Sequence, residues 1–134
     1  MTTEEKVAYW VELSDYDLKT ADAMLKTKRY LYVGFMCHQV IEKALKAVYS
    51  KRMEDTPPFV HKLVVIARQG GFYEQLSEEQ QDFIDWLEPL NIKARYPDHK
   101  KALARKLTQA KCKEILGKTK DLQRWIKETL LSAR

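Results

Sequence analysis

The sequence predicts an all-α protein, a bundle of about five helices in a single domain spanning residues 1–134. Apolar residues recur every three or four positions through most of the chain, which is the spacing of one helical face. Only 4 Gly and 4 Pro occur among the 134 residues, too few for the many turns of an all-β sandwich or barrel. No segment shows the alternation of polar and apolar residues that a half-buried strand requires.

The first two helices are predicted to form a hairpin. Thr2 and Glu5 have the spacing of a capping box, so the first helix begins near Thr3, and its apolar stripe continues to Leu25. A second helix covers roughly Tyr30 to Lys51, with a buried stripe of its own. Because the connection between the two helices is short, they should pack antiparallel.

The middle of the chain predicts two shorter helices. Asp55–Pro58 is a loop, because paired prolines stop a helix and favour extended backbone before them. A short helix from about Val60 to Gln69 ends at a pair of glycines, a common signal at helix C-termini. Ser77 and Gln80 have capping-box spacing and start a further helix, which Pro89 ends or kinks.

The last third predicts an irregular segment and one long closing helix. The irregular segment is Ala94–Asp98, where proline restricts the backbone. The apolar stripe of the closing helix runs from Leu103 towards the C-terminus at helical spacing. A step of five residues between Ala110 and Ile115 rotates this stripe, so a kink or a break is expected near Lys113.

Composition and motifs exclude several classes of protein. No window approaches the 18 uncharged apolar residues of a transmembrane helix, and the acidic N-terminal segment does not resemble a signal peptide. Cys37 and Cys112 have neither redox nor zinc spacing, which favours buried or free thiols in a reducing compartment. Phosphate-loop, dinucleotide and HExxH motifs are missing. We therefore expect a cytoplasmic protein without a metal, a cofactor or a membrane segment.

The charge is uneven along the chain, which is net +5 overall. Residues 1–92 carry 11 Lys and Arg against 15 Asp and Glu, whereas residues 93–134 carry 13 against 4. Several of these cations share one helical stripe, because a spacing of seven residues drifts by only ~20° per repeat. This basic stripe consists of Lys106, Lys113, Lys120, Arg124 and Lys127. It is either a track for nucleic-acid phosphates or an ordinary solvent face, and Lys111 and Lys118 lie off it and add only general charge.

A second candidate site combines the second helix with the loop at Ala94–Asp98. Polar residues at positions 39, 42, 43 and 46 are neighbours on one helical face. Arg95 could reach Glu42 from the loop, because its planar fork suits a carboxylate or a phosphate. The predicted ligand site consists of Gln39, Glu42, Lys43, Lys46, His61, Arg95 and Tyr96. It would bind an anion or a nucleotide. The alternatives are a solvated face with intrahelical ion pairs and a structural latch formed by Arg95.

Three segments resemble the HEPN (higher eukaryotes and prokaryotes nucleotide-binding) domain family. Gly34–Ala47 resembles its second helix, His61–Leu63 the start of its short third helix, and Ala94–Asp98 the loop of one large prokaryotic branch. Their order and separations fit, and the resemblance covers nearly the whole chain. It implies an antiparallel up-and-down bundle, commonly a homodimer. It also implies pairing with a minimal nucleotidyltransferase in a toxin–antitoxin-like system.

Many members of that family are metal-independent ribonucleases, with an Arg separated from a His by four to six residues. In such a site His acts as acid or base and Arg stabilises the phosphorane charge. None of the three His fits this spacing, and Arg95 and His99 are separated by only three residues that include Pro97. We therefore expect a non-catalytic protein that binds a nucleotide, an RNA or a protein partner. The alternative is an atypical ribonuclease that uses Arg95 and His99.

The residues of the first helix also favour a homodimer. Tyr9 and Tyr16 flank a stripe that already contains Trp10 and Val11, so one buried face does not accommodate them all. Aromatic residues are enriched in the cores of protein interfaces. The alternative is that the two tyrosines lie at the edge of the core with their hydroxyls in water.

Overall fold

The computed structural model describes residues 1–132, apart from the side chain of Pro97, and these residues form helices joined by short loops, with no strand. The helices are α1 (Thr3–Lys26), α2 (Tyr30–Met53), α3 (Leu63–Gln69), α4 (Glu78–Leu87), α5 (Leu90–Lys93), α6 (Pro97–Lys106) and α7 (Gln109–Trp125). A 3-10 turn, η1 (Tyr73–Gln75), precedes α4, and a π-helical segment, η2 (Ile126–Leu130), continues α7. The predicted helical bundle is confirmed.

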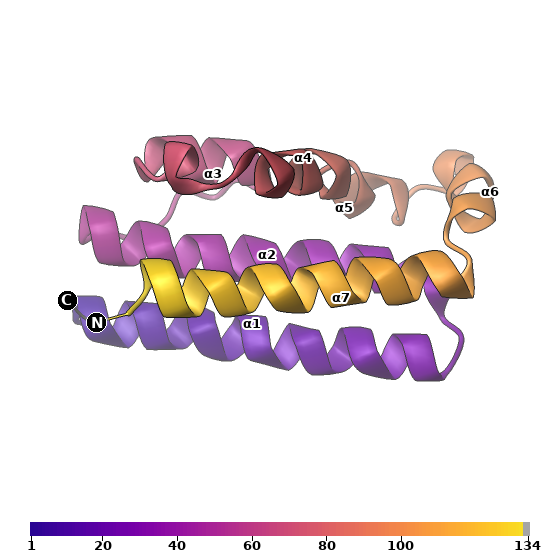
Figure 1. The fold of residues 1–134 in the computed structure, drawn as a ribbon, viewed down its shortest axis with the longest axis horizontal. Helices are drawn as coiled ribbons and strands as arrows, with labels where there is room; N and C mark the ends of the chain where they lie inside the picture. The colour runs from indigo at the N-terminus through magenta and orange to yellow at the C-terminus, as the bar shows by residue number, and fades with distance from the viewer. Residues whose placement is uncertain (133–134) are drawn as a thin grey trace.

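The chain runs up and down along one long axis (Figure 1). α1 and α2 form the antiparallel hairpin, α3 to α6 return in the direction of α1, and α7 runs back alongside α2. The third passage is therefore an interrupted one, made of four short helices where the other three are continuous. None of the helices described here has both the length and the hydropathy needed to cross a membrane.

Local side-chain and backbone signals fix where α1 and α4 begin and where the chain turns between α1 and α2. Thr2 Oγ1 accepts from the Glu5 amide at 3.1 Å, and the Glu5 carboxylate accepts from the Thr2 amide at 3.1 Å, which completes the capping box. Ser77 and Gln80 form the same box ahead of α4. The turn between α1 and α2 is tight because Lys28 adopts a left-handed backbone with φ of 62°.

α2 is the central helix of the bundle. It packs against α1, against α7, and against α3, α4 and α5, so side chains on nearly all its faces are buried. Glu42 and Lys46 are only 1% and 5% exposed. The interpretation of this polar face as a solvated surface is therefore wrong for these two residues, because the third passage of the chain covers it.

The predicted long closing helix is wrong, because the chain forms two helices there. The break lies at Leu107–Thr108 and not near Lys113. Thr108 has an extended backbone, and its hydroxyl accepts from the Lys111 amide at 3.2 Å, which makes it the N-cap of α7. α6 already begins at Pro97, a favoured residue for the first position of a helix, so the irregular segment is shorter than expected.

Candidate functional site

Glu42 lies buried near the middle of α2 and binds two side chains. Lys46 Nζ, one turn later, donates to Glu42 Oε2 at 3.1 Å, and His61 Nδ1 lies 3.1 Å from Oε1. Burial alone would raise the pKa of Glu42, but the Lys46 charge and the His61 hydrogen bond more than offset it, so the pKa lies below its ordinary value. The Lys46 ammonium also lies 5.3 Å from the centroid of the Trp10 ring. The carboxylate is thus ionised and neutralised inside the protein.

His38 adds a second imidazole to this cluster. Its side chain is fully buried, and its Nδ1 lies 3.7 Å from Glu42 Oε1. Its Nε2 has no hydrogen-bond partner among the described residues. Burial lowers the pKa of His38 to about 4, although the Glu42 charge acts in the opposite direction. His38 is therefore neutral near pH 7. Within residues 1–132 no three His, Cys, Asp or Glu side chains form a metal-binding group.

A neighbouring cluster joins α2 to α5. Gln39 Nε2 donates to Asn91 Oδ1 at 2.9 Å, and Gln39 Oε1 accepts from Lys43 Nζ at 2.9 Å. Lys43 also pairs with Asp17 of α1 at 3.3 Å. Asn91 is almost fully buried. Asn91 is not among the residues predicted from the sequence; its position one turn before Arg95 is the only signal that could have indicated it.

Arg95 follows α5 and contacts this second cluster at its edge. Its Nη2 lies 3.5 Å from Asn91 Oδ1, and its guanidinium lies 5.1 Å from the centroid of the Phe35 ring. Within the described residues Lys46 forms the salt bridge to Glu42 and the two histidine rings lie within 4 Å of its carboxylate, so Arg95 makes no direct pair with it. Six of the seven predicted ligand residues thus fall into two groups, with Glu42, Lys46 and His61 in one and Gln39, Lys43 and Arg95 in the other. Gln39 Nε2 lies 3.5 Å from His38 Nδ1 and links the two groups.

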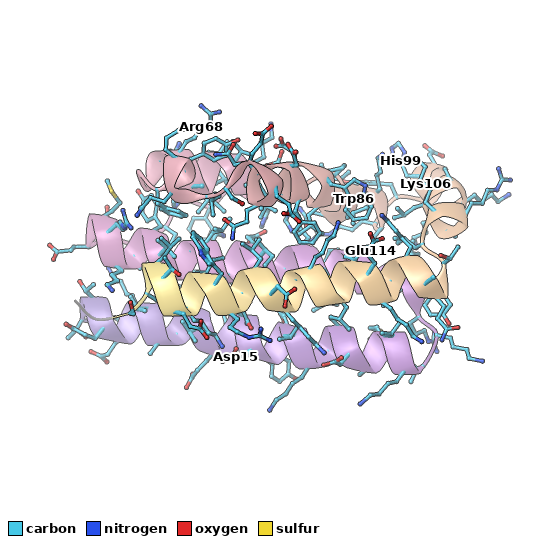
Figure 2. All side chains as sticks on the ribbon, viewed as in Figure 1. Asp15, Arg68, Trp86, His99, Lys106 and Glu114 are labelled. Atoms are coloured by element: carbon cyan, nitrogen blue, oxygen red, sulfur yellow. The ribbon has the colours of Figure 1, made fainter. Side chains whose placement is uncertain are left out.

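Tyr96 and His99 lie at the surface where the chain passes from α5 to α6. Tyr96 is the residue before α6 and is 54% exposed. His99 is exposed in the first turn of α6, and its backbone amide donates to the Tyr96 carbonyl at 3.1 Å. Figure 2 shows His99 at the α6 end of the interrupted passage. Arg95, Tyr96 and His99 therefore belong to the accessible surface, as His61 does, whereas His38, Glu42 and Lys46 are buried.

The predicted basic stripe is wrong as a continuous helical track. The break before Thr108 places Lys106 on α6, a different helix from the other four cations. Lys120 pairs with Asp22 of α1 at 3.1 Å, and Lys127 pairs with Asp15, which Figure 2 labels on α1. These pairs tie the closing helix to the acidic side of α1.

Comparison with known proteins gives a family and a fold. The sequence profile of the HEPN domain matches residues 7–129. The crystal structure of TT1696 from Thermus thermophilus superposes with a TM-score of 0.78 at 21% sequence identity, over 92% of this chain and 97% of that chain. No curated protein matches the chain. The profile match does not separate branches of the family, so the branch with the Ala94–Asp98 loop stays a prediction.

Proposed function

The chain belongs to the HEPN domain family, and we propose that it is a non-catalytic binding component that pairs with a minimal nucleotidyltransferase in a toxin–antitoxin-like system. The observation that carries this proposal is the surface around Arg95. Tyr96 and Ile92 beside it are each 54% exposed. Tyrosine and arginine are the residue types that most often dominate the binding energy of protein interfaces.

The states of the three histidines argue against catalysis. His38 is buried and neutral, and its pKa of about 4 makes it a poor base near pH 7. His61 directs its Nδ1 to Glu42, which holds the ring in place. His99 is exposed, but only three residues separate it from Arg95, and Pro97 at the start of α6 restricts that connection. An atypical ribonuclease built on Arg95 and His99 is the second candidate.

A nucleotide or an RNA is the second kind of ligand that we propose for the Arg95 surface, because a guanidinium offers paired donors to a phosphate. We also propose a homodimer through α1. Tyr9 and Tyr16 on α1 are 44% and 71% exposed, which supports an interface on that helix. Equilibrium sedimentation at micromolar concentration is expected to show the dimer, and a monomer would contradict it.

The partner proposal is tested with the product of the neighbouring reading frame. On this proposal that product is a minimal nucleotidyltransferase and forms a stable complex with the chain, and Arg95→Ala or Tyr96→Ala should weaken the complex by about tenfold or more. A neighbouring product of another kind would contradict the pairing. Arg68→Ala is the matched control, because the Arg68 guanidinium also lies over an aromatic ring, that of Tyr73 at 4.5 Å, but at the other end of the interrupted passage (Figure 2). Equal effects of the Arg95 and Arg68 changes would contradict the assignment of the surface.

The ribonuclease alternative has its own measurement. The pure protein is incubated with total RNA without metal, next to Arg95→Ala and His99→Ala variants. We expect no cleavage by any of the three. Cleavage by the wild type that both substitutions abolish would overturn the non-catalytic proposal.

A further inference from the structure

A groove of about 530 Å³ runs between α4 and α7. Both helices pack against α2, and the groove lies over the side chains between them. Ile115 and Leu122 of α7 form its base and are almost completely buried. Figure 2 shows Trp86 and Glu114 in the region where α4 and α7 face each other. This volume lies within the range of ordinary small-molecule sites.

Aromatic side chains form the walls of the groove. Phe83 and Trp86 come from α4 and Trp125 from the end of α7. Trp86 is 39% exposed, although it belongs to the residue types that proteins most readily bury at interfaces. Lys111 Nζ lies 5.1 Å from the Trp86 ring centroid and Lys118 Nζ 5.9 Å from that of Phe83. The ring faces in the groove are therefore already contacted by cations.

The rim of the groove is locally acidic, although the chain as a whole is net +5. Its charged lining residues are Glu79, Asp82, Lys111, Glu114, Lys118 and Asp121. Glu114 binds both lysines, at 3.0 and 3.7 Å, so their charge is partly neutralised. Glu79 and Asp82 on the α4 side form no ion pair among the described residues. A cationic group entering the groove on the α4 side would therefore find the carboxylates of Glu79 and Asp82, beside walls that are apolar.

We propose that this groove binds an amphipathic helix of a partner protein that carries Lys or Arg beside its apolar face. The apolar side chains would insert between the three aromatic walls, and the cations would face Glu79 and Asp82. The lining residues of α7 run from Lys111 to Trp125, which corresponds to ~21 Å of helix or about four turns. That length accommodates anchors at positions i, i+3 or i+4, and i+7 of the bound helix. The proposal does not depend on whether the partner is a nucleotidyltransferase.

The experiment selects binders from a displayed library of random 16-residue peptides on the immobilised full chain. Enriched peptides should be net positive and carry apolar residues at helical spacing. A representative synthetic peptide should bind at least about tenfold more weakly to the Phe83→Ala/Trp86→Ala variant. It should also bind more weakly to the Glu79→Lys/Asp82→Lys variant and at high salt, because part of the attraction is between charges. Phe59→Ala, a fully exposed aromatic in the loop before α3, is the matched control and should leave binding unchanged.

Three outcomes would overturn the proposal: no enriched peptide, enrichment of net-negative peptides, or equal affinity for the aromatic double variant. Should that double variant unfold, as its circular dichroism would reveal, the single change Trp86→Lys replaces it. Trp86 is partly exposed, so this change alters the wall and its charge with little cost to folding. Unchanged affinity for Trp86→Lys would likewise overturn the proposal.

Discussion

Lowering the pH should destabilise the protein through His38 before most carboxylates are protonated. Burial lowers the pKa of His38 from 6.5 to about 4, while in the unfolded chain the imidazole returns to 6.5. Between these two values the unfolded state binds more protons than the native state, so stability decreases as the pH falls. Well above pH 6.5 both states hold the neutral ring, and His38 adds no pH dependence to the stability.

The size of the effect follows from these two pKa values. Each tenfold difference in acid dissociation constant corresponds to about 1.4 kcal/mol, so the full loss approaches about 3 kcal/mol near pH 4. At pH 5 the expected loss relative to pH 8 is about 2 kcal/mol. Glu42 acts in the same direction at lower pH: its native pKa lies below 4.5, so its contribution is present above that value and is lost as the pH falls further.

Urea denaturation of the wild type and of a His38→Gln variant, followed by circular dichroism from pH 8 to pH 5, measures this contribution. Other titrating groups contribute almost equally to both proteins, so the difference between their pH profiles isolates His38. The wild type should lose about 2 kcal/mol more than the variant. Parallel profiles, or a His38 ring that titrates near pH 6.5 by NMR in the native protein, would refute this reasoning.

Three further changes test the packing, each by urea denaturation at pH 7.5. Lys46→Met should lower the free energy of unfolding by about 3 kcal/mol, because it leaves the buried Glu42 carboxylate without its main cation. The double variant Glu42→Leu/Lys46→Met should recover most of that loss. A Lys46→Met variant as stable as the wild type would contradict this. Thr108→Ala should cost about 1 kcal/mol through the lost N-cap of α7, and no loss would contradict the cap. Gly70→Ala should cost about 1–3 kcal/mol, because a Cβ there would lie 2.5 Å from the buried Phe72 ring; an unchanged midpoint would contradict this close contact.

Helix ends with local side-chain chemistry could be predicted from the sequence. The capping boxes at Thr2 and Ser77 join residues three positions apart, so no tertiary information is needed to recognise them. The N-cap at Thr108 is equally local but was missed. Leu103 and Leu107 precede Thr108 and are both buried, so buried apolar residues continue at helical spacing up to the break. The apolar pattern alone therefore looks like that of one helix.

The candidate site could be predicted only in part, because its geometry depends on distant segments. The sequence places Glu42 and Lys46 one turn apart, but their burial follows from α3 to α5 folding over α2. Likewise the sequence predicts only general charge for Lys111 and Lys118, whereas in the folded chain they contact Trp86 and Phe83 of α4. Such contacts join residues tens of positions apart, which periodicity cannot detect.

The central place of α2 has a consequence for synthesis of the chain on the ribosome. α1 is made first and can cover one side of α2 at once, whereas α7 begins 56 residues after α2 ends at Met53. At ordinary translation speeds this interval lasts about 3–10 seconds. During that time the apolar sides of α2 that later meet α7 have no partner, and exposed surfaces of this kind are where nascent chains aggregate or bind chaperones. Changes that slow the synthesis of α7 or its packing onto α2 should therefore lower the yield of folded protein more than they lower its final stability.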